Sequence, residues 1–393
     1  MSRSRSHIKN SDDQIDLFAD DNTPESPTMA KGEDNMVEIR GLLNSLDNTE
    51  ALLQHWQQAE WIRPLDVGFA RLIRELSEEQ GEEPDPLVLL LAALTSHQVG
   101  RGHVCIDLGN LLADAVQTLS LPPEESSYQP PKDTDTSETH QPEPAELLAL
   151  VTLSECLALL GASCAVSDGS HTTPLVLNDT RLYLRRFWRY EQCIAEGIRQ
   201  RLTLPSSLAD PESGPARTLS RALDQLFQSS EAVDYQKLAC ALAARNRFAV
   251  ITGGPGTGKT TTVVNLLAAL QAVAGESPDR AGRKYRIRLA APTGKAAARL
   301  NESIGGAVSR LPLADLPGNV ELADIPTRVT TLHRLLGSRP DTRRFRHNRD
   351  NPLLVDILVI DEASMVDVDL MASVFDALPA NAQLILLGDK DQL

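Results

Sequence analysis

The C-terminal part of the chain switches repeatedly between two kinds of hydrophobic pattern. From about residue 233, short apolar runs are each followed by a longer stretch whose apolar residues stand three or four apart. Such runs predict buried strands, and the longer stretches predict helices that cover them. The expected strands are FAVITG, IRLAAP, ILVIDE and QLILLGD, and the expected helices are VDYQKLACALAA, TTVVNLLAALQAVA, KAAARLNESIGGAV and SMVDVDLMASVFDAL. This order predicts an α/β fold with a parallel sheet covered on both faces.

The preceding residues, 36–232, show a mostly helical pattern. LLNSLDNTEALLQHWQQAEWI and VGFARLIRELSEEQ have helical spacing of apolar residues, and DPLVLLLAALTSHQVGRGHVCIDL contains a nearly continuous apolar stretch that predicts a buried helix. TPLVLNDTRLYL predicts two short strands around an Asn-Asp turn, followed by a further helix. We therefore expect a mostly helical N-terminal domain before an α/β domain at 233–393.

Two segments have the composition of disordered or linking chain. Residues 1–35 are polar with few apolar positions, which predicts a disordered tail. Residues 122–145 are rich in Pro, Ser, Thr and acidic residues, which predicts a surface loop or linker. The sequence stops directly after a predicted strand, and from this we expect it to be a truncated form of a longer chain.

The charge is unevenly distributed along the 393 residues. Lys and Arg total 38 and Asp and Glu total 54, a net charge of −16, which argues against a protein that coats nucleic acid or a basic membrane binder. Residues 246–393, however, carry 18 basic and 16 acidic residues, a net charge of +2, whereas residues 1–245 carry −18. The acidity therefore belongs to the N-terminal part and does not exclude nucleic acid as a ligand of the α/β domain.

Several features point to the cytoplasm. No apolar run reaches the length of about 20 residues that a membrane helix needs. The N-terminus has no apolar core of the kind a signal peptide requires. The five cysteines form no C-x-x-C pair, which favours reduced thiols. We expect a cytoplasmic protein with no membrane association.

The strongest chemical signal is a glycine-rich segment between a predicted strand and a predicted helix. It fits the pattern G-x-x-x-x-G-K-[ST], in which backbone N–H groups and the start of a helix bind phosphate. The lysine would reach the β- and γ-phosphates of ATP, and the hydroxyl that follows would bind Mg²⁺. The residues expected to bind the cofactor are Gly253, Gly254, Pro255, Gly256, Thr257, Gly258, Lys259, Thr260 and Thr261.

A pair of carboxylates follows another predicted strand. Asp361 and Glu362 end the run ILVIDE, about one hundred residues after the glycine-rich segment. An aspartate at such a strand end can hold Mg²⁺, and the adjacent glutamate can act as general base on the attacking water. Alone, an acidic pair here would be an ordinary solvated strand end; its position after the glycine-rich segment predicts a catalytic pair.

Other polar segments are weaker signals. Pro292, Thr293 and Gly294 follow a strand and could contact a phosphodiester, although a plain strand-to-helix turn explains them equally well. The segment GSRPDTRRFRHNRD interleaves arginines with an aromatic residue, which suits single-stranded nucleic acid but equally a solvated loop. Gln236 could contact adenine, or could lie on the surface. The strand end LLGDKDQ could sense the γ-phosphate.

Taken in order, these segments resemble superfamily 1 helicases. Gln236 is followed by GGPGTGKTTT, APTGKAAARL, TLHRLLG, VIDEASM and LLGDKDQL, the order of motifs Q, I, Ia, Ib, II and III. The residues of these motifs are most similar to those of the RecD family, the alpha subunits of RecBCD-type enzymes (exodeoxyribonuclease V). The resemblance covers residues 235–393 closely and the N-terminal region loosely.

The resemblance implies a function and partners. It implies an ATP-dependent, Mg²⁺-requiring 5′-to-3′ DNA helicase subunit that takes a single strand from a duplex end, in double-strand break repair and recombination. It implies a heterotrimer with RecB-like and RecC-like subunits, with the N-terminal region docking on the RecC-like one. Motifs IV to VI and the second RecA-like domain are absent, so we expect these 393 residues to bind nucleotide weakly, to hydrolyse ATP slowly and not to unwind DNA.

The resemblance also implies roles for single residues. Lys259, Asp361 and Glu362 would be catalytic, with Thr260 and Asp361 as the metal ligands. Gln392 would couple the state of the γ-phosphate to DNA, and Gln236 would contact adenine. Residues 338–350 would form the small 1B insertion near the fork. The DNA contacts implied are Pro292, Thr293, Gly294, Thr331, His333, Arg343, Arg344 and Arg346.

Two alternatives stay open from the sequence. A P-loop ATPase that switches without moving along DNA would need the same nucleotide residues but no strand-binding track. A protein whose residues 36–232 serve mainly as an interaction module would bind a partner subunit without ATP. The sequence shows no cluster of acidic residues with a lysine of the kind a nuclease needs, so we expect nuclease activity to belong to other subunits.

Overall fold

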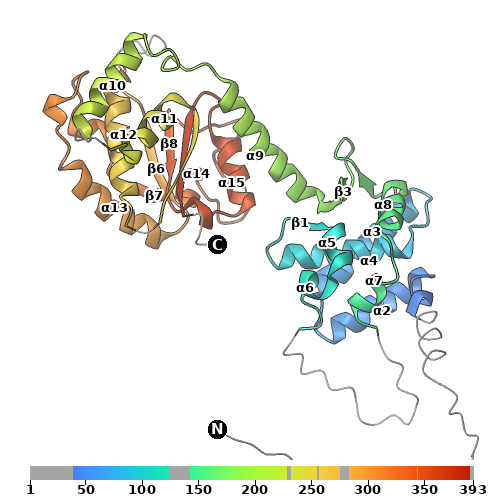
Figure 1. The fold of residues 1–393 in the computed structure, drawn as a ribbon. Helices are drawn as coiled ribbons and strands as arrows, with labels where there is room; N and C mark the ends of the chain where they lie inside the picture. The colour runs from blue at the N-terminus through green and yellow to red at the C-terminus, as the bar shows by residue number, and fades with distance from the viewer. Residues whose placement is uncertain are drawn as a thin grey trace, which may run out of the picture.

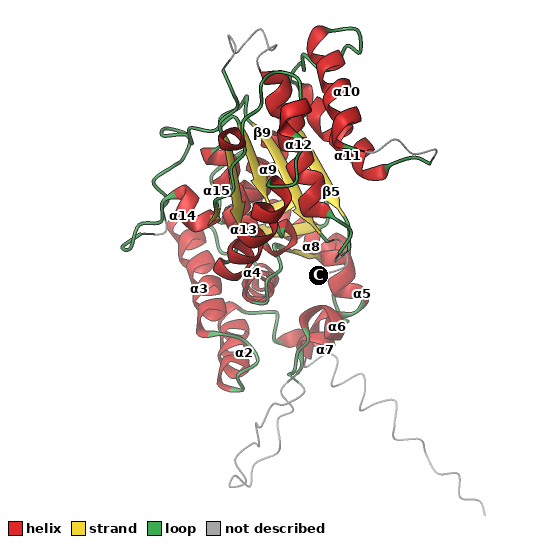
Figure 2. Cartoon of the chain, turned by 90° about the vertical axis from the view of Figure 1, so that its left-hand side faces the viewer, coloured by secondary structure: helices red, strands yellow, loops and turns green. Residues whose placement is uncertain are grey.

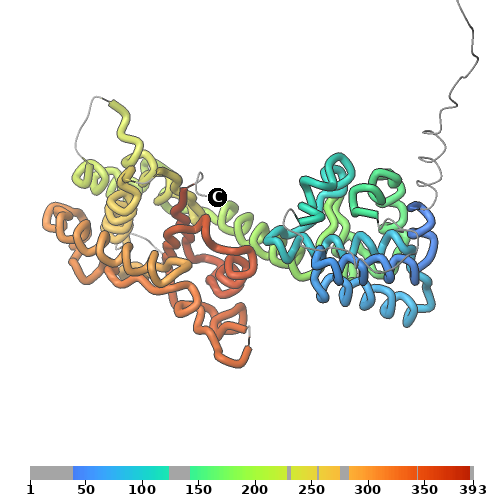
Figure 3. The backbone as a smooth tube through the Cα atoms, turned by 90° about the horizontal axis from the view of Figure 1, so that it is seen from below, coloured from blue at the N-terminus to red at the C-terminus, as the bar shows by residue number. Residues whose placement is uncertain are grey.

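The computed structural model describes residues 39–123, 142–227, 232–254, 256–274, 283–342 and 344–389. It has two lobes, which the long helix α9 (Arg185–Thr203) joins (Figure 1; Figure 3 gives the view from below). The predicted tail at 1–35 and most of the predicted linker at 122–145 lie outside the described residues. Among the helices of the described ranges, none combines the length and the apolar character of a membrane span.

The N-terminal lobe is built around one buried helix. α4 (Pro86–Gly100) is buried from Leu87 to Gln98, as its continuous apolar sequence predicts. Asp85 caps it by accepting a hydrogen bond from the N–H of Leu87 at 2.8 Å, and Pro86 occupies its first turn. The helices around it are α2 (Leu46–Gln58), α3 (Pro64–Glu79), α5 (Leu108–Ala113), α6 (Ala115–Leu119), α7 (Pro144–Leu148) and α8 (Leu153–Ala162).

A small sheet completes this lobe. Its order is β1-β4-β3-β2, with strands β1 (Cys105–Asp107), β2 (Val166–Ser167), β3 (Leu175–Asn178) and β4 (Arg181–Leu184). The predicted pair of strands around the Asn-Asp turn is confirmed as β3 and β4, with Asp179 in the left-handed region at φ 53°. β1 and β2 have three and two residues, too few for a periodic signal, and sequence patterns missed them.

The second lobe holds a five-stranded sheet in the order β5-β9-β8-β6-β7. Every strand pair in it is parallel, as the apolar runs predict. The strands are β5 (Phe248–Thr252), β6 (Ile287–Ala291), β7 (Val329–Thr331), β8 (Ile357–Ile360) and β9 (Gln383–Gly388). The helices are α10 (Gly214–Leu226), α11 (Tyr235–Arg245), α12 (Lys259–Ala274), α13 (Gly294–Val308), α14 (Leu332–Leu336) and α15 (Val368–Ala377).

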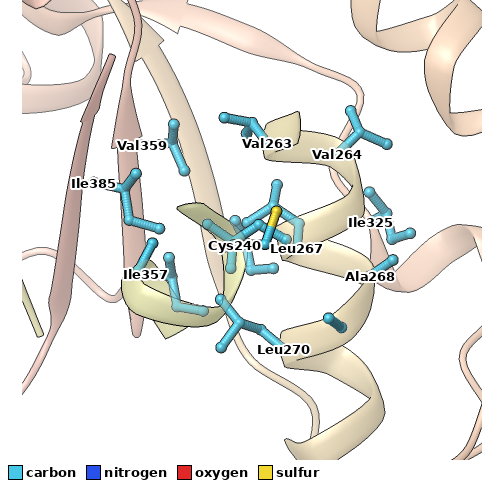
Figure 4. Close-up of a cluster of buried hydrophobic side chains, with 14 of the residues drawn as sticks. Cys240, Val263, Val264, Leu267, Ala268, Leu270, Ile325, Ile357, Val359 and Ile385 are labelled. Carbon is cyan, nitrogen blue, oxygen red and sulfur yellow. The ribbon is translucent and has the colours of Figure 1, made fainter. Parts of the chain in front are cut away.

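Alternate residues of each strand reach two separate layers of helices. In β8, Ile357 and Val359 pack with α10 to α13, whereas Leu358 and Ile360 pack with α9, α14 and α15. Figure 4 shows the first layer, where side chains of α12 such as Leu267 meet β8 and β9. The two layers enclose the sheet (Figure 2), so a parallel sheet covered on both faces is confirmed.

The two lobes divide earlier in the chain than the sequence pattern indicates. The hydrophobic core of the N-terminal lobe ends with β4, whereas Cys193 and Ile198 of α9 and Leu219 of α10 join the cores of the second lobe. Core packing therefore joins α10 and the part of α9 from Cys193 onward to the second lobe, whereas Trp188 near the start of α9 still contacts Tyr183 of β4. An amphipathic helix shows in its sequence that it buries one face, but not against which domain.

Two local details of the α/β lobe also differ from the sequence pattern. β7, with only three residues, was not expected as a strand. The helix expected from Ser364 starts only at Val368, after a 3₁₀ turn, η4 (Ala363–Met365). Asp367 caps α15 by accepting from the N–H of Leu370 at 2.7 Å, and this cap fixes the later start.

Candidate nucleotide and nucleic-acid site

The glycine-rich loop lies between β5 and α12, as predicted. Gly256 and Gly258 have φ angles of 76° and 80°, in the left-handed region where a side chain would strain the backbone. A Cβ on Gly258 would also lie 2.7 Å from the amide nitrogen of Gln236. The backbone conformation therefore favours glycine at 258, and a side chain there would also displace the amide of Gln236.

Lys259 is the first residue of α12, and its ammonium group turns back into the loop. It donates hydrogen bonds to the carbonyl oxygens of Gly253 and Gly254, the latter at 3.1 Å. The hydroxyl of Thr257 also donates to Gly254, at 2.9 Å. The lysine charge thus lies within the curve of the loop, where phosphate oxygens would meet backbone N–H groups.

Gln236 rests on this loop. Its side-chain amide donates to the carbonyl of Thr257 at 3.0 Å. Asp234 caps α11 by accepting a hydrogen bond from the backbone N–H of Gln236 at 2.9 Å. This cap fixes the start of the helix that carries the glutamine. Gln236 is thus half-buried with its side chain held against the glycine-rich loop, and its contact with adenine stays a prediction.

Asp361 and Glu362 follow β8. The N–H of Asp361 donates to the carbonyl of Ala290 at 2.9 Å, which continues the sheet pairing by one residue. Burial raises the pKa of the Asp361 carboxyl and the charge of Glu362 adds to this, whereas the nearby Lys259 ammonium lowers it. Glu362 has φ 51°, a left-handed conformation that is uncommon for a residue with a side chain of this kind.

The groups available fit a magnesium ion. Thr260 offers a hydroxyl and Asp361 a carboxylate, and Mg²⁺ prefers oxygen ligands of this kind. A second observation points to a missing polar partner: the hydroxyl of Ser364 is buried and has no hydrogen-bond partner among the described residues. It lies between the turn after β8 and the end of β9, close to Gly388. Sequence reasoning missed Ser364, because a serine in a turn carries no signal of its own.

The residues predicted to contact a DNA strand lie at the carboxyl ends of β6 and β7. Ala291 pairs with Thr331, so the turns that follow these strands are neighbours. Thr293 caps α13 and Thr331 caps α14, each accepting from the N–H group three residues further on, at 3.2 and 3.3 Å. Thr293, Gly294 and His333 are exposed, and Pro292 and Thr331 are half-buried.

The arginine-rich segment forms a compact loop against α14. Isolated bridges join Ser338 to Phe345 and Asn348 to Asn351. Phe345 packs against the hydrophobic core and its ring lies 5.8 Å from that of His333, so it is not an exposed platform for a base. Arg349 pairs with Asp376 at 3.4 Å, whereas Arg344 and Arg346 are exposed.

Three predicted site residues fall outside the described ranges: Pro255, Arg343 and Gln392. The other predicted site residues form two groups along the edge of the sheet where the strands have their carboxyl ends. The cofactor residues, which include the half-buried Thr260 and the exposed Thr261, gather at the ends of β5 and β8. The residues predicted to contact a DNA strand gather at the ends of β6 and β7. The end of β9 lies beside the glycine-rich loop, where the N–H of Gly253 donates to the carbonyl of Gly388 at 3.3 Å.

A parallel sheet of this order, with a glycine-rich loop between its strand β5 and helix α12, defines a P-loop domain. Residues 236–393 match the model of a protein family described as an AAA domain. Residues 58–183 match the N-terminal domain of RecBCD enzyme subunit RecD. The chain belongs to the RecD family.

Similar proteins agree with this membership. RecBCD enzyme subunit RecD of Mycolicibacterium smegmatis is 38% identical over 337 residues, 85% of this chain and 51% of the relative. The RecD subunit of Haemophilus influenzae is 34% identical over 333 residues, 84% and 48% of the two chains. The ATP-dependent RecD2 DNA helicase of Deinococcus radiodurans is 33% identical over 213 residues, 54% and 24%. The chain spans about half the length of the RecD subunits it matches.

Proposed function

We propose that this chain carries the first motor domain of an ATP-dependent DNA helicase subunit. The observation that carries the proposal is the sharing of one sheet edge: the phosphate loop and Asp361 stand at the ends of β5 and β8, and Thr293 and Thr331 stand at β6 and β7. A change at the nucleotide can reach the strand-contact turns through the intervening strand ends. A P-loop switch without a track would need no exposed residues at β6 and β7.

The nucleotide chemistry follows from the residues of the loop. Backbone N–H groups of the loop and the Lys259 ammonium would hold the phosphates of ATP. Thr260 and Asp361 would hold Mg²⁺, which when bound neutralises charge that develops on the transferred phosphoryl group. Glu362, the carboxylate next to Asp361, would orient the attacking water and accept its proton.

The finer assignments extend the same proposal. The motor moves 5′ to 3′ on a strand taken from a duplex end, as part of a RecBCD-type enzyme in double-strand break repair and recombination. RecB-like and RecC-like subunits are its partners, and the N-terminal lobe docks on the RecC-like one. That lobe has its own hydrophobic core, which suits a docking domain. The proposed location is the cytoplasm.

A crossed experiment on the 393-residue protein tests the two halves of the site. Lys259→Gln removes the charge in the loop, and we expect its affinity for a fluorescent ATP analogue with Mg²⁺ to fall at least tenfold while binding of oligo-dT is retained. Thr293→Ala combined with His333→Ala should lower the affinity for oligo-dT while the affinity for the ATP analogue is retained. Lys237→Gln is the matched control, because Lys237 lies on α11 and pairs with Asp224 at 2.6 Å.

Each arm has an outcome that contradicts its half of the proposal. Unchanged nucleotide affinity in Lys259→Gln would remove the nucleotide site. Unchanged oligo-dT affinity in the Thr293 and His333 double variant would remove the strand track and favour a P-loop switch.

A further inference from the structure

A short segment at the start of α9 has a composition unlike the rest of its surroundings. The ten residues 181–190, RLYLRRFWRY, contain four arginines, four aromatic residues and no acidic residue. The whole chain has only fifteen Phe, Trp and Tyr residues, and residues 1–245 have a net charge of −18. Such a concentration of positive charge and rings within acidic chain requires its own explanation.

The arginines of this segment differ from other surface arginines in their partners. Arg74 pairs with Asp47, Glu50 and Glu78, and Arg199, further along α9, pairs with Glu196 at 3.0 Å. Within the described part of the chain, no carboxylate lies within ion-pairing distance of Arg186 or Arg189, and both side chains are exposed. Their charge is therefore available to an external anion.

The aromatic residues divide into two sets. Trp188 and Tyr183 stack edge to face at 5.2 Å and close onto β4 and Gly169. Phe187 and Tyr190 form a second edge-to-face pair at 5.9 Å, half-buried, and the guanidinium of Arg186 lies 4.8 Å from the centre of the Phe187 ring. Rings beside a guanidinium plane are surfaces on which nucleobases stack.

The first turn of α9 lacks the usual stabilising groups. Leu184 at the N-cap provides no side-chain hydrogen bond, and the first turn has no acidic residue. Arg185 and Arg186 instead place positive charge at the positive end of the helix dipole, which is unfavourable. In addition, Nη1 of Arg185 is buried with no hydrogen-bond partner among the described residues, a costly state for a charged group. A phosphate bound at this first turn would offset the unfavourable charge at the helix N-terminus.

The segment is also held in place from both sides. Its strand, β4, belongs to the sheet of the N-terminal lobe, and the following part of α9 packs on α15 of the second lobe. In Figure 1, α9 is the element that connects the two lobes. Rigid elements on each side fix the arginines and rings in one geometry, which reduces the entropy lost on binding.

We propose that the bridging-helix patch (Arg185, Arg186, Phe187, Arg189 and Tyr190) binds single-stranded DNA, its arginines on the phosphates and its rings against bases. The inference rests on the proposed function for the choice of DNA as the polymer. The patch is separate from the turns after β6 and β7, and it gives the strand a contact on the connection between the lobes.

The test is oligo-dT binding by the 393-residue protein, measured by fluorescence anisotropy at several salt concentrations. Arg186→Ala combined with Arg189→Ala should weaken binding about tenfold. Loss of two phosphate contacts should lower the slope of log affinity against log salt by about 1.4. Arg199→Ala with Arg217→Ala is the matched control, since both side chains are exposed and already paired with glutamates; it should bind within twofold of the parent. Circular dichroism melting checks that the variants fold.

A second readout locates the contact directly. Photo-crosslinking with 5-iodouracil in the oligonucleotide should label the peptide that contains Phe187 and Tyr190, and inorganic phosphate at millimolar concentration should not abolish this labelling.

The outcomes separate this inference from the proposed function. Unchanged affinity and salt slope in the Arg186 and Arg189 variant would overturn the patch, and a patch that docks an acidic protein would give that result. If the Thr293 and His333 variant still loses affinity, the proposed function stands without the patch. If only the patch variant loses affinity, the patch stands and the proposed track fails.

Discussion

Asp361 shows how one residue of the site is set by its surroundings. In the sequence it is one of two adjacent carboxylates with the same chemistry. In the fold, burial raises the pKa of Asp361, while Glu362 has a left-handed backbone conformation. The two therefore differ in environment although they are adjacent, which suits one for a metal ion and the other for water.

The raised pKa predicts a pH-dependent cost. Because the folded state binds a proton on Asp361 more tightly than the unfolded state, stability falls as pH rises from the ordinary value of 3.8 through the higher folded value. Asp361→Asn removes this cost, so its melting temperature should exceed that of the parent at pH 7, and the difference should shrink as pH approaches 4. Asp341→Asn, at an exposed position, is the control and should show no such trend. A difference independent of pH would refute the assignment.

Residue types and spacing were enough to predict that Lys259 and the glycines of the loop lie between β5 and α12 and that Asp361 follows β8. They were not enough for Gln236, whose amide reaches Thr257 across twenty-one positions of sequence. Phe345, the aromatic residue of the arginine-rich segment, packs against the hydrophobic core. Such outcomes depend on which distant residues become neighbours, and a local pattern does not contain that information.

At the scale of elements, α9 and α15 illustrate close helix packing. Gly197 of α9 faces the ring of Phe375 of α15, and a Cβ on Gly197 would overlap that ring. Phe375 has little freedom to move, because it lies 6.4 Å from Phe248 and 5.3 Å from the guanidinium of the buried Arg201. Arg201 in turn donates hydrogen bonds to three carbonyls of the turn after α15, those of Leu378, Pro379 and Ala382. These bonds join the C-terminal part of α9 to the end of α15.

This packing predicts opposite effects for two glycine-to-alanine changes in helices. Gly305→Ala in α13 has nothing within 4 Å of the new methyl group, so it should stabilise the protein by about 0.5–1 kcal/mol through helix propensity. Gly197→Ala should instead destabilise it by about 2 kcal/mol, because overlap with the ring outweighs that gain. Urea unfolding measures both, and equal effects at the two sites would contradict the packing described.

The sequence pattern identified the longer elements and missed the shortest ones. FAVITG, IRLAAP, ILVIDE and QLILLGD are β5, β6, β8 and β9, because strands buried on both faces are continuous apolar runs. β7 has three residues, and its first N–H is satisfied by the side chain of Asn301 at 2.7 Å. An edge strand completed by a side chain leaves no periodic signal in the sequence.

At the scale of the whole molecule, the two lobes have separate cores joined through α9. The three tryptophans of the chain all lie in or against the N-terminal lobe. Trp56 is fully buried in the N-terminal core, where its indole N–H donates to Pro142 at 3.1 Å, and Trp61 packs against the same core. Trp188 contacts Tyr183 of β4.

This distribution predicts that two probes of unfolding will respond differently to nucleotide. With Mg²⁺ and ATP at one hundred times the dissociation constant, the P-loop lobe should gain about 2.7 kcal/mol. Circular dichroism should show part of the transition moving to higher temperature, whereas the transition seen by tryptophan fluorescence should stay in place. If both probes moved together, the lobes would unfold as one cooperative unit, contrary to the prediction.

The sequence by itself determined the α/β class, the parallel sheet and the residues of the phosphate loop, because each follows from residue type and spacing within one short segment. The tertiary structure alone decided which lobe α9 and α10 join, what Gln236 rests on and that Arg349 pairs with Asp376. It also decided that the arginines and rings at the start of α9 lie at the connection between the lobes. These features require contacts between residues far apart in the chain, and the free energy of such contacts depends on how the whole chain packs.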